Sequence, residues 1–64
     1  MWIVIYFSKR KEDADRVKSL MENAGIIVKV RDVNNFDGDI KAYEVLVTDA
    51  DVQNAHNIII DAEV

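Results

Sequence analysis

The sequence WIVIYFS, at Trp2–Ser8, sets the architecture of this chain. Nearly all of its side chains are β-branched or aromatic, which is typical of a β-strand. With strict alternation, one face of this strand carries Ile3, Ile5 and Phe7, and the other carries Trp2, Val4 and Tyr6. Both faces are then apolar, and a strand of that kind is covered on both faces.

The composition around this strand predicts one small domain over residues 1–64. Of the 64 residues, 50% are hydrophobic and 31% charged, the formal net charge is −4, and there is no cysteine or proline. No apolar run is long enough to span a membrane, and no basic segment precedes an apolar one as in a signal peptide, so we expect a cytoplasmic protein. A chain this short buries only about 60% of its unfolded surface. Without a disulfide, it needs very good packing or a second copy of itself.

After the first strand, the hydrophobic pattern changes to a helical period. The apolar residues recur at spacings of three and four: Ala14, Val17, Leu20, Met21 and Ala24. Ser8 is the expected N-cap of this helix, and Gly25 stands where a left-handed C-terminal stop belongs.

Two more strands follow Gly25. The segment 26–33 alternates, with Ile26, Val28 and Val30 on one face and Ile27, Lys29, Arg31 and Val33 on the other. A loop over Asn34–Asp39, with turn residues around Gly38, separates it from a third strand, Tyr43–Val47.

The last part of the chain favours a helix. Thr48–Asp51 resembles a capping box with Asp in place of Glu, and Val52, Ala55, Ile59 and Ala62 form one apolar stripe behind it. Ile58–Ile60 are three consecutive β-branched residues, which are mediocre helix formers. The alternative is a short fourth strand, with Ile58, Ile60, Ala62 and Val64 facing inward.

The resulting order, β-α-β-β-α, predicts an α+β fold. A right-handed crossover between the first two strands leaves a gap that the third fills, which gives an antiparallel sheet of order 1-3-2. Both helices are expected on one face, in a two-layer sandwich. This is the ferredoxin-like plan without its last strand.

The missing strand leaves the first strand as an apolar edge. Natural proteins blunt such edges with Lys, Pro or a bulge, and none of these is expected in residues 2–7. We therefore predict a homodimer, with an interaction surface formed by Trp2, Val4, Tyr6, Ile27 and Leu46. If the first strand faces the other way, Ile3 and Ile5 take the place of Trp2, Val4 and Tyr6 in this surface. The competing interpretation is a monomer whose second helix shields the edge.

A second candidate site is the start of the first helix. Ser8, Lys9, Arg10 and Lys11 combine a hydroxyl and three cations with the free amides of a helix N-terminus, which suits a phosphate or carboxylate. No glycine-rich turn accompanies them, so a solvated loop is the simpler interpretation.

Other functions find little support in the sequence. The acidic net charge and only three clustered cations argue against nucleic-acid binding. The segment 33–44 matches a calcium loop in part, but Val33 stands where the first ligand belongs. His56 has no nucleophile or base beside it, so it is interpreted as a boundary residue, and no catalytic set can be assembled. We expect no enzyme activity, cofactor or metal.

Three segments carry a family resemblance: Trp2–Tyr6, Leu20–Ile26 and Tyr43–Ala55. Together they resemble a family of small bacterial domains of unknown function that are labelled putative signal-transducing proteins. The resemblance implies a ferredoxin-like fold, similar in plan to nitrogen-regulatory signalling proteins and to amino-acid-binding regulatory domains. It implies no catalytic residues, and Asn34–Ala42 has no counterpart of the long nucleotide-binding loop of the nitrogen regulators.

The sequence thus favours a non-catalytic regulatory or protein-interaction module that is homodimeric and binds itself or another protein. The alternative is a sensor of an anionic small molecule at Ser8–Lys11.

Overall fold

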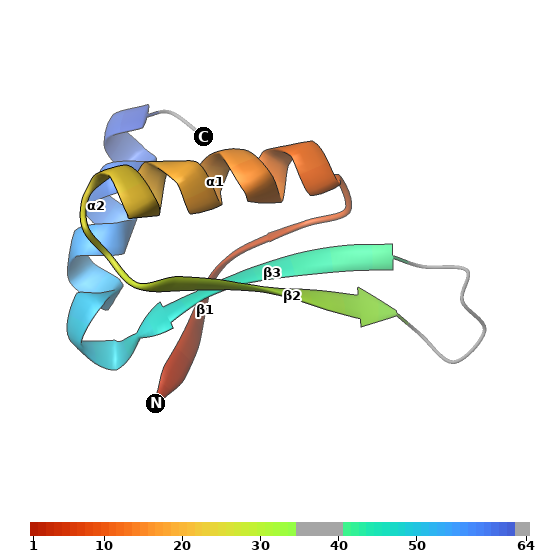
Figure 1. Ribbon diagram of the computed structural model, residues 1–64, viewed down its shortest axis with the longest axis horizontal. Helices are drawn as coiled ribbons and strands as arrows, with labels where there is room; N and C mark the ends of the chain where they lie inside the picture. The colour runs from red at the N-terminus through yellow and green to blue at the C-terminus, as the bar shows by residue number, and fades with distance from the viewer. Residues whose placement is uncertain (35–40, 63–64) are drawn as a thin grey trace.

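The computed structural model describes residues 1–34 and 41–62 (Figure 1). The elements run β1 (Trp2–Ser8), α1 (Lys11–Asn23), β2 (Val28–Asn34), β3 (Lys41–Thr48), the 3₁₀ turn η1 (Asp49–Asp51) and α2 (Val52–Ala62). The predicted β-α-β-β-α order is confirmed. The loop expected over residues 34–39 lies outside the described residues, except for Asn34, which ends β2.

The three strands form one antiparallel sheet with β3 in the middle, in the predicted order 1-3-2. Val28 and Val30 of β2 stand opposite Val47 and Val45 of β3. Directly opposed residues in an antiparallel pair share a face, so these four valines lie on the same side of the sheet. Both outer strands, β1 and β2, are edges of the described sheet.

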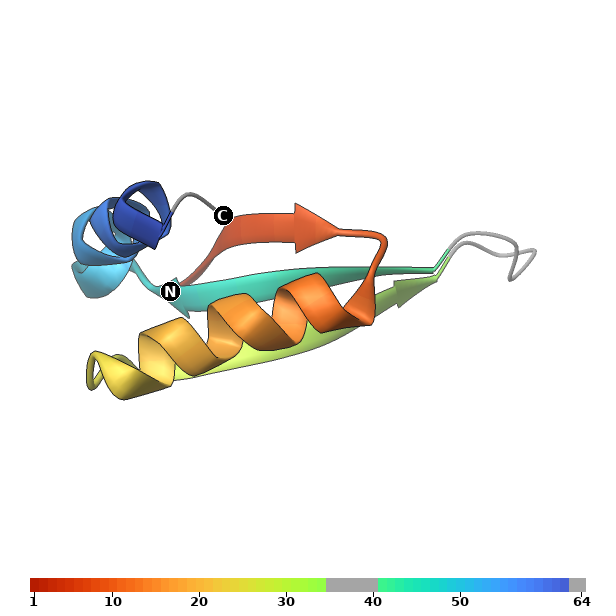
Figure 2. The ribbon, with the colours of Figure 1, turned by 90° about the horizontal axis from the view of Figure 1, so that it is seen from above.

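The two helices lie on one side of the sheet, as predicted. Figure 1 shows α1 running along the sheet, while α2 rises from the end of β3 at a steep inclination to α1. In the view from above, α1 covers the β2 side, and α2 stands at the end where β1 begins (Figure 2). The core between these layers consists of Ala14, Val17, Met21, Ile26, Val45, Val47 and Ala55. No helix of the described residues covers the opposite side of the sheet.

A β-bulge at Ile5 breaks the alternation of β1. Val4 pairs with Leu46 and Tyr6 pairs with the adjacent Val45, so Ile5 is the extra residue. The prediction that residues 2–7 contain no bulge is therefore wrong. Sequence gives no sign of such a bulge, because every residue from Trp2 to Phe7 suits a regular strand.

The bulge also changes which side chains share a face. Val45 and Val47 point into the core, so Tyr6 and Ile3, which pair with them, lie on the helix side. The prediction that Tyr6 shares a face with Trp2 and Val4 is wrong. Phe7, opposite Glu44, takes that place and is 55% exposed.

The first helix ends as predicted but begins later. Gly25 has φ +79°, the Gly25 N–H donates to the Glu22 carbonyl at 3.0 Å, and the Ile26 N–H donates to the Met21 carbonyl at 3.0 Å. These two bonds form a Schellman motif, which confirms the Gly25 stop. At the other end, the N-cap is Arg10, so the prediction of Ser8 as N-cap is wrong. The Ser8 hydroxyl instead accepts a hydrogen bond from the Arg10 N–H at 3.0 Å.

Residues 58–62 are helical, which confirms the predicted helix and excludes the fourth strand for these residues. Glu63 and Val64 lie outside the described residues.

The capping box at Thr48–Asp51 is not formed. Thr48 Oγ1 donates to the Asp51 carboxylate at 3.4 Å and makes no side-chain cap to the backbone, because a 3₁₀ turn precedes α2. Ala55 is the buried residue of α2, and Ile58 and Ile59 pack against the core.

Candidate interaction surface

The side of the sheet turned away from α1 is the strongest candidate for a functional surface. We call it the open face. Its members follow from the strand register: Trp2, Val4 and Phe7 of β1, Lys29, Arg31 and Val33 of β2, and Ala42, Glu44, Leu46 and Thr48 of β3.

These side chains stand in rows across the three strands. One row is Val4, Leu46 and Lys29, and the next is Phe7, Glu44 and Arg31. In these two rows, apolar side chains lie along β1 and charged side chains lie along β2. Trp2, Val4 and Phe7 are 42%, 40% and 55% exposed, whereas Leu46 on the central strand is only 4% exposed.

A cation–π contact spans the open face. The Lys29 ammonium lies 5.5 Å from the centre of the Trp2 ring. Trp2 stands beside Thr48 and Lys29 stands beside Leu46, so the contact crosses the central strand between these two residues. A cation at this distance is attracted by the face of the indole ring.

Arg31 and Glu44 form the second polar contact of the open face. The Arg31 Nε donates to Glu44 Oε1 at 2.8 Å, and the Arg31 terminal nitrogen donates to the same oxygen. The Glu44 side chain is 19% exposed and the Arg31 side chain 56%. Both cations of this face therefore already have a partner within the sheet.

The structure brings together three of the five predicted surface residues: Trp2, Val4 and Leu46. Tyr6 packs against the core on the other side, and Ile27 precedes β2 and is 71% exposed. Ile3 and Ile5, the predicted replacements, do not join the open face, because Ile3 pairs with Val47 and Ile5 packs against the core. Phe7 was missed, since only the bulge turns it to this side.

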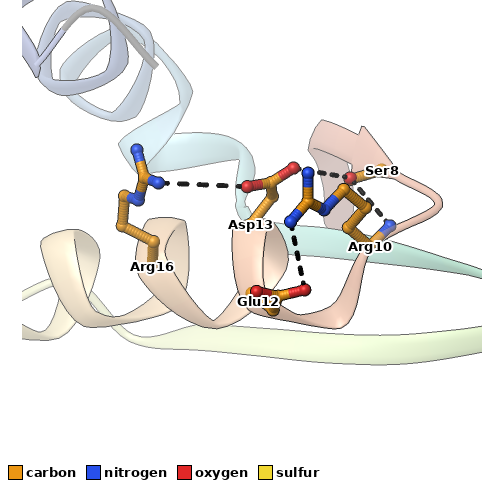
Figure 3. Close-up of polar contacts among 5 residues, drawn as sticks. All are labelled: Ser8, Arg10, Glu12, Asp13 and Arg16. Atoms are coloured by element: carbon orange, nitrogen blue, oxygen red, sulfur yellow. Dashed lines mark hydrogen bonds and ion pairs between the residues drawn. The ribbon is translucent and has the colours of Figure 1, made fainter.

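The predicted anion site at the start of α1 is rich in carboxylates (Figure 3). The Ser8 hydroxyl donates to Asp13 at 3.4 Å, and an Arg10 nitrogen lies 3.3 Å from Glu12. The Arg16 guanidinium is 4.0 Å from the other Asp13 oxygen. Arg10 is thus paired by a residue of its own helix turn, and Ser8 does not cap the helix. A bound anion would have to compete with Glu12 and Asp13 for these groups.

The remaining features to place are His56 and the calcium-like segment. No pocket forms there, and nowhere in residues 1–34 and 41–62 do three His, Cys, Asp or Glu side chains gather as metal ligands. His56 is exposed on α2. Residues 35–40 of the calcium-like segment lie outside the described part of the chain. Neither described helix has the length and apolar character needed to cross a membrane.

Comparison with known families gives one match. The model of a family described as putative prokaryotic signal transducing protein matches residues 2–63, which include every strand and helix described above. Comparisons with curated proteins and with solved structures gave no match. The chain therefore belongs to the family of putative prokaryotic signal transducing proteins.

Proposed function

We propose that this chain is a non-catalytic protein-interaction module of prokaryotic signal transduction, and that it acts as a homodimer. The observation that carries the proposal is the group of apolar side chains Trp2, Val4 and Phe7, each at least 40% exposed on the open face. Apolar side chains exposed together on one face are typical of interaction sites, and aromatic residues are enriched in such sites.

The dimensions of the molecule are compatible with a dimer of ordinary size. A standard interface buries about 800 Å² per partner. That is about 18% of the chain's 4494 Å² of accessible surface.

A second copy is also a reasonable solution to a stability problem. Small domains without disulfides or metals often depend on association to bury enough apolar surface. Within residues 1–34 and 41–62, the core on the helix side contains seven buried residues, and α2 contributes one of them, Ala55. Covering Trp2, Val4 and Phe7 would add a second apolar layer on the other side of the sheet.

The rival function, a sensor of an anionic small molecule at Ser8–Lys11, has no structural observation in its favour. Its hydroxyl and Arg10 are engaged by Asp13 and Glu12. We therefore do not advance it.

Sedimentation velocity over a range of concentrations tests the proposed dimer. We expect a species of twice 7.3 kDa at tens of micromolar. Val4→Lys should shift the chain to a monomer, because it places a charge in the apolar part of the open face. Ile60→Lys is the matched control, since Ile60 is 71% exposed on α2, away from this face. A wild-type chain that stays at 7.3 kDa up to hundreds of micromolar would overturn the proposal.

A further inference from the structure

We propose that β1 pairs with β3 in two registers and that the bulge at Ile5 belongs to the major one only. In the minor register, which is regular, Phe7 turns to the helix side and Tyr6 takes its place on the open face. The fold thus contains a switch that changes which aromatic side chain the open face displays. Both registers exist within a single chain, so this inference does not require the proposed homodimer.

The pairs before the bulge, from Trp2 to Val4, define the second register. When they are continued without a bulge, every later residue of β1 has a new partner in β3: Ile5 stands opposite Val45, Tyr6 opposite Glu44, Phe7 opposite Tyr43 and Ser8 opposite Ala42. Ala42 belongs to β3, so the central strand is long enough for this pairing.

The two registers exchange side chains of the same kind. Tyr6 packs against the core in the bulged register, and Phe7 replaces it on the helix side in the regular one. A one-residue slip is costly where it turns polar side chains into the core, but here it exchanges two aromatic ones. Phe7 also comes to stand opposite Tyr43, which packs against the core, and opposed aromatic residues stabilise a sheet. The regular register further restores the ladder that the bulge interrupts.

The contacts of Ser8 favour the bulged register. Its hydroxyl donates to Asp13 at 3.4 Å and accepts from the Arg10 N–H at 3.0 Å (Figure 3). In the regular register Ser8 turns to the open face, away from α1, so its bond to Asp13 breaks. Ser8 therefore couples the start of α1 to the choice of aromatic residue on the open face.

The start of α1 can follow this movement. Advancing β1 by one residue shifts Ser8 by about 3.3 Å along β3. Lys9, Arg10 and Lys11 are exposed, and Ala14 is the first buried residue of α1. The segment 9–13 can therefore adjust without moving a buried side chain.

NMR relaxation dispersion and saturation transfer test the two registers, because they detect minor states that exchange in microseconds to milliseconds. We expect one exchange process at the amides of residues 5–8 and 43–45, with a minor state of about 0.1–10%. The exchange should persist in Val4→Lys, which is expected to be monomeric. Val4 stands opposite Leu46 in both registers, so this substitution favours neither of them.

Two further variants identify the process. Ser8→Ala should raise the minor population several-fold, because it removes the bond to Asp13, whereas Lys9→Ala, at the exposed neighbour, should leave it unchanged. Deleting Ile5 removes the extra residue of the bulge but keeps Phe7 opposite Glu44, so the exchange should disappear.

Three results would overturn the inference: no minor state in either the wild type or Ser8→Ala, an equal population in Ser8→Ala and Lys9→Ala, or exchange that survives the deletion of Ile5. If the deletion variant does not fold, the comparison of Ser8→Ala with Lys9→Ala decides. Exchange that is lost in Val4→Lys would also overturn it, because association would then be its source. These outcomes are independent of sedimentation, which alone decides the proposed homodimer.

Discussion

The Lys29 ammonium lies 5.5 Å from the centre of the Trp2 ring, on the opposite side of the central strand. Lys29 belongs to one edge strand and Trp2 to the other, so a side-chain contact joins two strands that share no backbone hydrogen bonds. The contact spans the open face near Leu46.

Replacing Lys29 by Met should lower the free energy of unfolding by about 0.5–1 kcal/mol, the usual size of an exposed cation–π contact. Met keeps the length and apolar stem of lysine but removes the charge. Urea unfolding measures the change, and Lys41→Met, at an exposed strand lysine, serves as the control. Equal losses in the two variants would contradict a specific Lys29–Trp2 interaction.

Trp2 is the only tryptophan, so its fluorescence reports directly on the open face. It is 42% exposed in the isolated chain. If the open faces stack, its emission should move to shorter wavelength as the protein concentration rises, because the ring loses water. Val4→Lys should abolish this concentration dependence and Ile60→Lys should keep it. An emission maximum that is independent of concentration while sedimentation shows a dimer would place the interface elsewhere.

The anion-sensor alternative and the interaction module predict different effects of removing the three cations at the start of α1. Because Lys9, Arg10 and Lys11 do not belong to the open face, replacing the three together by Ala should leave self-association unchanged. Inorganic phosphate should raise the melting temperature of the wild type and of the triple variant equally. If phosphate instead raised the melting temperature of the wild type saturably and left that of the triple variant unchanged, the result would favour the anion sensor.

Most of the fold was predictable, because each of its elements has a strong local signal. The spacing of Ala14, Val17 and Met21 specified one helix face, and all three residues are buried. Gly25 supplied the helix stop, since only glycine adopts its φ of +79° without strain. The order 1-3-2 then followed from the handedness of the crossover.

The open face was only partly predictable, because one long-range feature controls it. Tyr6 and Phe7 are both aromatic, and either could face the core in a strand whose residues are all apolar. The choice between them depends on the pairing of β1 with β3, which no local signal reports. Trp2 and Val4 precede the bulge and were therefore assigned to the correct face, whereas Tyr6 follows it and was not.

Substitutions of Gly25, whose backbone is left-handed, should change the free energy of unfolding and not self-association. A Cβ added to Gly25 would meet no atom within 4 Å, so Gly25→Ala costs only the strain of the left-handed conformation. That strain is roughly 1–2 kcal/mol. Gly25→Asn should lose less, because asparagine tolerates this conformation better than alanine does. Urea unfolding at equal protein concentration compares the three chains, and an alanine variant as stable as the wild type would contradict the Schellman ending of α1.

Two neighbouring aromatic residues test the bulge itself. Tyr6 packs against the core on the helix side, whereas Phe7 is 55% exposed on the open face. Tyr6→Lys should therefore destabilise the fold by several kcal/mol, because it buries a charge without a partner. Phe7→Lys should leave the free energy of unfolding of the monomer almost unchanged and weaken the dimer instead. Urea unfolding below the dimerisation range and sedimentation above it separate these effects. Without the bulge, regular alternation would exchange the two roles, so a stable Tyr6→Lys monomer beside an unfolded Phe7→Lys chain would refute the bulge.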